Sequence, residues 1–423
     1  ADAQSSGVHS FGVKFDGAPT IQFNGATEPY SPFKDRIKQF YRTGKSFSNS
    51  IALSGGNDNG SFRLSYDNTD ANAIMPNSDY HKKIFNFGLN YKLTPKLSAQ
   101  LNANYSNEYN HNPPQIGIQD LNANTTIYTM ATSINPDWFQ NYKDANGNET
   151  ALSRFTNRNN PYWVAYQRFE NVHRDRLFGN ASVRYQFTDW LYLQGRVGQD
   201  YFTRPYNYDR PTGTRSIGAV ATGFNGYYYQ DVSTFRERNL DFLLGANHKF
   251  GNFGIDATFG GNALQQTYDD LSTAVTNFYV RDLYTIGNGQ TKSPNYTYGR
   301  KRVNSFYGSA EFSFKNYLYI TATARNDWFS TLNINSNSYL YPSVSGSFVV
   351  SELLGTSTPK WMDYAKVRLA YAEVGGDTDP YSNNLYYSLN ANSFNGTALG
   401  SISSDVSPNA NLRPLKVKEK EAG

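Results

Sequence analysis

The sequence contains no cysteine, which excludes disulfide bonds, thiolate metal sites and a cysteine nucleophile. It also has no apolar run of about 18 residues, so no helix is predicted to cross a membrane. The 39 basic and 35 acidic residues are dispersed, and no basic stripe typical of nucleic-acid-binding proteins is present. We therefore expect no nucleic acid partner. These observations do not exclude a transmembrane β-barrel, because its alternating strands have a low average hydropathy.

Aromatic residues are abundant in an otherwise polar chain. There are 34 Tyr, 28 Phe and 5 Trp, although only 38% of all residues are hydrophobic. A chain this polar with few aromatics would be typical of disorder. The aromatics instead predict a folded protein that gathers its apolar side chains on one face.

Apolar and polar residues alternate with a period of two in about twelve segments, which predicts β-strands. Segment 177–187 is a clear case, because its even positions carry Asn180, Ser182, Arg184 and Gln186. Phe178 is the exception, and its place at the strand end makes it a candidate girdle residue. The odd positions of the segment are Leu177, Gly179, Ala181, Val183, Tyr185 and Phe187. The segments have roughly 8–14 residues each, and a tilted strand needs about 9–11 residues to cross a bilayer.

Short and long connections alternate strictly between these segments. Short turns are expected at 55–60, 94–96, 188–189, 251–252 and 315–316, and long polar loops near 69–83, 108–173, 204–236, 262–302 and 327–340. Outer-membrane barrels have this asymmetry, with short periplasmic turns and long extracellular loops. Aromatic residues also flank the short turns, as expected of a girdle at the membrane interface. We predict an all-β fold, an antiparallel transmembrane β-barrel of which the chain supplies about twelve strands.

The sequence carries no recognisable catalytic motif. The five histidines are scattered, and segment 144–148, which resembles the start of a calcium loop, has Phe155 where a bidentate Glu is required. We read that segment as a turn and expect no metal, no cofactor and no enzymatic activity.

Aromatic side chains interleave with amides and charges in two of the long loops. Flat rings with polar neighbours suit ligands such as sugars or peptides. The candidate substrate-binding residues are Trp138, Tyr162, Trp163, Tyr166, Tyr227, Tyr228 and Tyr229. The alternative is that these rings pack the loops together at the mouth of the barrel.

Several motifs occur in a fixed order along nearly the whole chain. They include Ile74-Met75-Pro76-Asn77-Ser78-Asp79-Tyr80, Arg325-Asn326-Asp327, Tyr341-Pro342-Ser343-Val344-Ser345, Val374-Gly375-Gly376-Asp377-Thr378-Asp379 and Leu412-Arg413-Pro414. In this order they resemble the SusC/RagA-type TonB-dependent transporters of the Bacteroidota outer membrane.

This resemblance implies how the chain is organised. Residues 1–45 would follow a plug domain that the sequence does not include, and residues 46–423 would form part of a larger, plugged barrel. It also implies import of glycans or peptides with a SusD-like surface lipoprotein. Energy would come from the TonB–ExbB–ExbD complex, acting through the missing N-terminal part. The aromatic loops would then have a third reading, as docking sites for the lipoprotein.

Two other classes of protein remain as alternatives. One is a passive porin-like barrel in the same membrane. The other is a soluble all-β carbohydrate-binding protein or glycosidase, whose aromatics would cap the ends of a β-sandwich.

Overall fold

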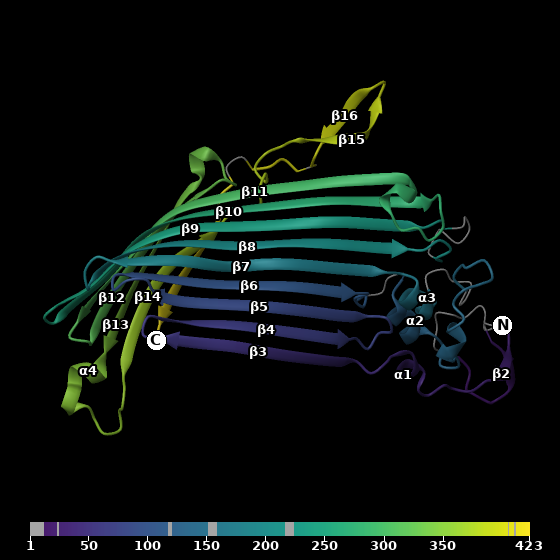
Figure 1. The fold of residues 1–423 in the computed structure, drawn as a ribbon, viewed down its shortest axis with the longest axis horizontal. Coiled ribbons are helices and arrows are strands. Elements are labelled where there is room, and N and C mark those ends of the chain that lie inside the picture. The colour runs from purple at the N-terminus through teal and green to yellow at the C-terminus, as the bar shows by residue number, and fades with distance from the viewer. Residues whose placement is uncertain are drawn as a thin grey trace.

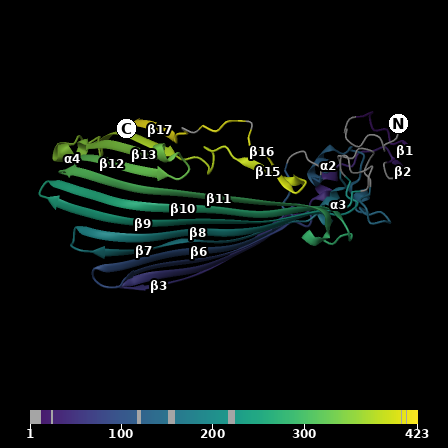
Figure 2. The same ribbon diagram turned by 90° about the horizontal axis from the view of Figure 1, so that it is seen from above.

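One large antiparallel sheet dominates the structure. The computed structural model describes residues 12–22, 25–116, 121–150, 159–215, 224–404, 406–409 and 412–423. Thirteen strands pair in the order in which the chain produces them, from β3 at one edge to β14, and β17 pairs with β14 at the other edge. The sheet curves along its width (Figures 1 and 2). The predicted all-β barrel architecture is confirmed, with about the expected number of strands.

The strands of this sheet lengthen toward its middle and shorten again. Their bounds are β3 (Lys45–Asn57), β4 (Gly60–Asn72), β5 (Asp79–Lys92), β6 (Leu97–His111), β7 (Glu170–Gln186), β8 (Leu191–Arg210), β9 (Tyr227–Phe250), β10 (Phe253–Phe278), β11 (Gly289–Phe314), β12 (Leu318–Phe329), β13 (Ser338–Val349), β14 (Lys366–Gly376) and β17 (Leu415–Ala422). Two small hairpins stand apart, β1 (Pro19–Ile21) with β2 (Thr27–Pro29) and β15 (Tyr387–Phe394) with β16 (Thr397–Ile402).

The two ends of the sheet differ as the sequence predicts. Tight turns join β3 to β4, β5 to β6, β7 to β8, β9 to β10 and β11 to β12 at one end, together with a longer link that contains α4 (Val350–Leu354). The opposite end carries the longer connections and the short helices α1 (Arg36–Phe40), α2 (Ala123–Thr129) and α3 (Pro161–Tyr166) (Figure 1). At the turn between β11 and β12, Lys315 and Asn316 both have positive φ, the conformation of a two-residue type I′ hairpin turn.

The register between neighbouring strands places apolar residues opposite apolar ones and polar residues opposite polar ones, so the sheet has two distinct faces. One row across the sheet reads Phe62, Leu89, Leu101, Ala181, Val197 and Leu240, and the row next to it reads Arg63, Gly88, Asn102, Asn180, Gly198 and Asn239. We call the apolar side the outer face, which meets lipid, and the polar side the inner face, which lines the lumen. A one-residue slip of any strand would exchange its two faces.

The long loops are shorter than the sequence suggested, because the strands continue past the apolar band. Most of 262–302 belongs to β10 and β11, which leaves a connection of only 279–288, and 204–236 is reduced to 211–226. The backbone ladder continues where the side chains turn polar on both faces, since strand pairing needs hydrogen bonds rather than an apolar face. Loss of alternation therefore marks the end of the membrane band, not the end of the strand.

The apolar core lies in a loop layer at the helical end of the sheet, formed by α1, α2, α3 and the short helix η2 (Pro136–Phe139) with the segments that join them. Its buried members include Phe40, Ile127, Met130, Phe139 and Val164. Tyr208 of β8, an inner-face residue, packs against this cluster. The loop layer therefore folds over the inner face at the rim. Among the described helices, none is both long and apolar enough to span a membrane.

We expect the two faces of β7 to be separable by spin labels in the full-length protein reconstituted in lipid. A label at Val183→Cys should be relaxed by oxygen, and one at Arg184→Cys by a water-soluble nickel chelate. The reason is that an arginine on the lipid face costs about 2–4 kcal/mol near the bilayer midplane. The pair Leu101→Cys and Asn102→Cys on β6 is the control and should behave alike. Reversed accessibility would overturn the assignment of the faces.

Candidate functional site

The inner face is lined by polar side chains that bond to one another across strands. Arg176 of β7 donates two hydrogen bonds to Asp200 of β8, at 2.9 and 2.6 Å. Arg196 forms an ion pair with Asp241, at 3.5 Å. These pairs neutralise charge along the wall and suit a lumen filled by water or by polar protein.

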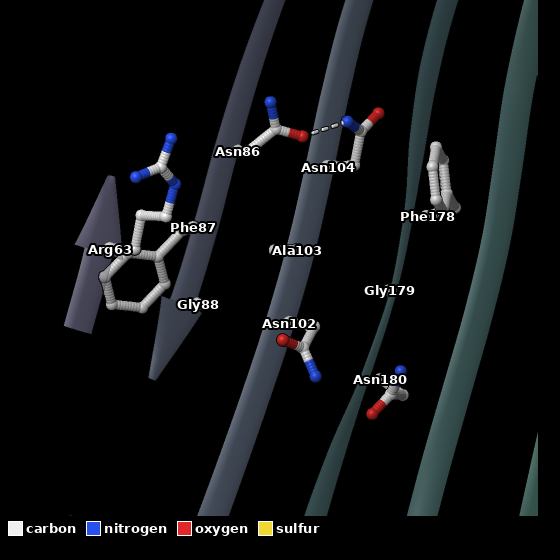
Figure 3. Close-up of a pocket in the computed structure, with 10 residues that line it drawn as sticks. All are labelled: Arg63, Asn86, Phe87, Gly88, Asn102, Ala103, Asn104, Phe178, Gly179 and Asn180. Carbon is white, nitrogen blue, oxygen red and sulfur yellow. Dashed lines mark hydrogen bonds between the residues drawn. The ribbon is translucent and has the colours of Figure 1, made fainter. Parts of the chain in front are cut away.

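A hollow of about 350 Å³ opens on this wall between β4 and β7. It is lined by Arg63, Asn86, Asn102, Asn104, Phe178 and Asn180, with the backbone of neighbouring residues as its floor (Figure 3). Gly88 contributes no side chain in the middle of this set, which leaves the space open. Asn104 donates a hydrogen bond to Asn86. The remaining amides can bond to whatever fills the lumen.

Tyrosine rings lie flat across glycines elsewhere on the inner face. Tyr307 of β11 crosses Gly260 of β10 and donates a hydrogen bond to Asp241 of β9 at 2.7 Å. A Cβ at Gly260 would come within 2.6 Å of the ring, so only glycine permits this crossing. The ring therefore joins three strands without projecting far into the lumen.

Four tyrosines form a rim cluster where β8 and β9 meet the loop layer. Tyr206 contacts Tyr229, and Tyr208 contacts Tyr227, each with ring centroids 5.9 Å apart and edge to face. The Tyr206 hydroxyl donates to Glu170 at 3.2 Å. Glu170 also forms an ion pair with the buried Arg168. The rim cluster thus combines aromatic faces with charges of both signs on the inner face.

Acidic groups continue the rim cluster along β9 and β10. Asp231 lies 4.0 Å from Arg204, and Ser233 donates to Asp270 at 2.8 Å. Burial, and next the neighbouring Asp270, raise the pKa of Asp231. Two carboxylates near one arginine form an acidic patch that favours cationic groups on a ligand.

Within the loop layer, Glu149 is buried and joins three segments. It accepts hydrogen bonds from the backbone of Asn160 at 2.6 Å, from the backbone of Arg215 at 2.7 Å and from the amide of Asn159 at 3.0 Å. Burial raises the pKa of Glu149 to about 7, although these donors lower it. The carboxylate holds the loop before α3 against the loop after β8.

The predicted binding residues of the first loop gather in the loop layer. Trp163 is 1% exposed, and its indole donates to Thr214 at 3.1 Å. Tyr162 packs edge to face on Phe40 at 5.3 Å. Trp138 is half-buried and contacts Phe33 at 5.7 Å, whereas Tyr166 is 39% exposed.

The three consecutive tyrosines of β9 separate onto two faces. Tyr227 and Tyr229 belong to the rim cluster on the inner face, and Tyr228, opposite Asp209, projects the other way. Sequence reasoning did not single out Tyr206, Tyr208 or Glu170. The sequence shows that Tyr206 and Tyr208 are two residues apart and so share a face of their strand. Their contact with β9 depends on the register between strands, which the sequence does not show.

The segment 144–148 is a turn, as expected. Asp144 Oδ1 accepts hydrogen bonds from the backbone of Asn146 and of Asn148, both at 2.8 Å. These bonds, that of Asn148 foremost, lower the pKa of Asp144. Arg281 then donates to Asn148 at 3.2 Å and to the Thr212 carbonyl at 3.1 Å, which fastens the turn to the neighbouring loops.

We expect the order of the loop layer to depend on pH through Glu149. The pKa of this group is raised from 4.5 to about 7, so its protonated form is favoured in the fold. The contribution of Glu149 to the free energy of unfolding is fully present below pH 4.5 and is lost as the pH rises to 7, by about 3 kcal/mol in total. Hydrogen exchange of residues 139–150 and 159–169, after correction for the intrinsic base-catalysed rate, should lose protection over this window. Glu149→Gln should abolish the pH dependence of this protection. The control Asp363→Asn, at an exposed position, should preserve it. Protection that still depends on pH in Glu149→Gln would contradict this role.

Replacing Trp163 should disorder the loop layer more than replacing Trp138. Removing a buried tryptophan costs about 3–5 kcal/mol, and a half-buried ring costs less. Trp163→Ala should therefore expose 121–150 and 159–169 to limited proteolysis, while Trp138→Ala leaves them largely protected. Equal protection in both variants would show that the loop layer does not depend on this indole.

Comparison with known proteins matches this architecture. No protein-family model matches the chain. Two curated relatives from Formosa agariphila are each 20% identical: TonB-dependent receptor P26 over 344 residues and TonB-dependent receptor P3 over 377 residues. The matches cover 78% and 87% of this chain, but only 33% and 37% of the relatives. The chain thus spans little more than a third of their length.

Solved structures share the fold at low sequence identity. The RagAB peptide importer in its closed-closed state superposes with a TM-score of 0.77 at 16% identity, over 93% of this chain and 43% of that one. The P. aeruginosa receptor FpvA, bound to a pyoverdine, gives a TM-score of 0.55 at 15% identity, over 90% of this chain and 44% of that one. The ordered motifs, the two relatives and the shared fold together make the chain similar to the β-barrel part of TonB-dependent outer-membrane receptors, and they agree with the predicted SusC/RagA-type resemblance and with strands that lie in the outer membrane.

Proposed function

We propose that the chain forms part of the wall and mouth of a transporter that imports large polar nutrients across the outer membrane with energy from TonB. The observation that carries this proposal is the rim cluster, which lies on the inner face where the loop layer folds over the lumen. A ligand entering from the loop end would meet these side chains before it met the wall below. The curated relatives are named TonB-dependent receptors, which supports the same source of energy.

Of the two substrate classes, the charges at the rim favour peptides over neutral glycans. Asp231 and Asp270 can accept from an amino terminus or a lysine, and Arg204 can bind a carboxylate. The faces of Tyr227 and Tyr229 can cover apolar side chains. The structurally similar RagAB is described as a peptide importer, which agrees with this choice.

We assign the remaining predicted residues different roles at this mouth. Trp138, Tyr162 and Trp163 pack the loop layer, since their rings contact other loop residues. Tyr166 is the exposed ring of that set. We propose that it contacts the substrate or a SusD-like lipoprotein docked over the mouth.

The alternation of faces on β9 provides a matched test. In the full-length transporter, Tyr227→Ala/Tyr229→Ala should weaken binding of a tryptic casein digest by about tenfold, because two aromatic contacts worth about 0.5–1.5 kcal/mol each are lost. Tyr228→Ala, which removes the intervening ring on the other face, should change affinity by less than about twofold. Isothermal calorimetry in detergent measures both.

Three results would count against this proposal in different ways. Equal loss of affinity in the double variant and in Tyr228→Ala would remove the rim cluster as the contact surface. Binding of maltooligosaccharides in place of peptides would contradict the substrate class and leave import itself intact. Uptake that persists in vesicles without TonB would contradict the energy source.

A further inference from the structure

Four arginines form a patch on the outer face of β9 and β11. They are Arg236, Arg238, Arg300 and Arg302, and all four side chains are exposed. Thr267 of β10 lies between Arg236 and Arg300, and Gln265 lies between Arg238 and Arg302. Since strands are about 4.8 Å apart, the two arginines of each row lie about 10 Å from each other across β10. We call this two-by-two array the arginine patch.

The arginine patch starts where the apolar band of the outer face ends. From the turn at 251–252, the outer face of β9 presents Phe250, His248, Ala246, Leu244, Phe242 and Leu240 before Arg238. That is about 11 strand residues, the length with which a tilted strand crosses the hydrocarbon core. Arg238 and Arg302 therefore lie at the level of the outer-leaflet headgroups, on the side of the loop layer.

The charges of the arginine patch are not balanced by carboxylates of the described part of the chain. Among the described residues, no carboxylate lies within 4.0 Å of any of the four guanidinium groups. Arg236 lies over the Tyr201 ring at 5.5 Å, and Arg302 donates to Gln265 at 3.2 Å. Asp269, in the next row outward, accepts from Tyr296 instead.

Several arginines on the inner face of the same sheet have carboxylate partners instead. Arg176, Arg196, Arg204 and Arg325 each have an aspartate partner at 2.6–4.0 Å. Arg63 and Arg184, also on the inner face, have no carboxylate within 4.0 Å among the described residues but stand singly. The outer arginines differ because four of them gather in one array, which suits an anion with several oxygens.

A groove of about 550 Å³ lies directly below the arginine patch on the outer face. Its walls include Leu240, Phe242, Phe306 and Trp328. Gly261 of β10 lies in register between Phe242 and Phe306, and both rings lean over it, since a Cβ there would come within 2.4 Å of Phe242 and 3.0 Å of Phe306. An apolar groove that ends at four cations matches an acyl chain with an anionic head.

We propose that the arginine patch and this groove together bind a phosphate-bearing lipid of the outer leaflet, with guanidinium groups on the phosphates and an acyl chain in the groove. Guanidinium groups bind phosphate oxygens in pairs, and the low dielectric next to the bilayer strengthens these bonds. A free phosphate would use the arginines but gain nothing from the groove. The proposal does not depend on import, because the site lies on the face opposite the rim cluster.

The test uses the full-length transporter, purified in a neutral detergent and stripped of lipid, with diphosphoryl lipid A as the probe. Native mass spectrometry should show lipid A bound to the unaltered protein. The quadruple variant Arg236→Gln/Arg238→Gln/Arg300→Gln/Arg302→Gln should bind it at least about tenfold more weakly, because charge-assisted phosphate contacts are lost. The control Lys360→Gln/Lys366→Gln removes exposed charges at the turn end and should bind normally.

Further arms separate the sources of the phosphate and the contribution of the groove. Ala263→Leu, which narrows the groove, should weaken lipid A binding without changing the affinity for inorganic phosphate. Displacement of lipid A by millimolar inorganic phosphate would show a simple anion site and overturn the lipid assignment. Equal lipid A binding by the quadruple variant would overturn the site itself, provided that its heat resistance on electrophoresis matches that of the control.

Discussion

The need to pair every backbone amide and carbonyl within the hydrocarbon core governs this structure. Consecutive antiparallel strands satisfy it locally, and the sheet follows chain order from β3 to β14. Once the ladder is set, side-chain direction is no longer free, because alternate residues must meet lipid and lumen. The apolar and polar rows that run across six strands result from this constraint. Loops, clusters and patches are placed relative to those rows.

The two faces use the same residue types for different purposes. Several arginines of the inner face, among them Arg176 and Arg196, pair with aspartates, which neutralises charge along the wall. Those of the outer face are unpaired within the described chain, where the outer-leaflet headgroups can supply anions. Tyrosines of the inner face also differ in role with their position. Tyr307 packs across Gly260 within the wall, whereas Tyr227 and Tyr229 make edge-to-face contacts in the rim cluster. Position relative to the membrane, more than residue type, decides the role of each side chain.

Prediction from the sequence succeeded where the physical rule is local and periodic. The alternation in 177–187 and the turn at Lys315 and Asn316 needed only neighbouring residues for their interpretation. Prediction fell short where strands continued beyond the apolar band. In β10 and β11 the outer segments are polar on both faces, so their alternation carries no hydropathy signal even though their backbones stay paired.

The sequence by itself determined the approximate number of strands and the faces of their residues within the membrane band, because a period of two encodes both. The alternation of short and long connections determined the sidedness of the loops. Tertiary structure alone decided which side chains meet. The indole of Trp163 donates a hydrogen bond to Thr214, 51 positions away. The arginines of β9 and β11 form one patch because both strands pair with β10, at Thr267 and Gln265. These meetings depend on the register between strands and on loop closure. Both are set by hydrogen bonds and packing between segments that are distant in the chain, which no local pattern records.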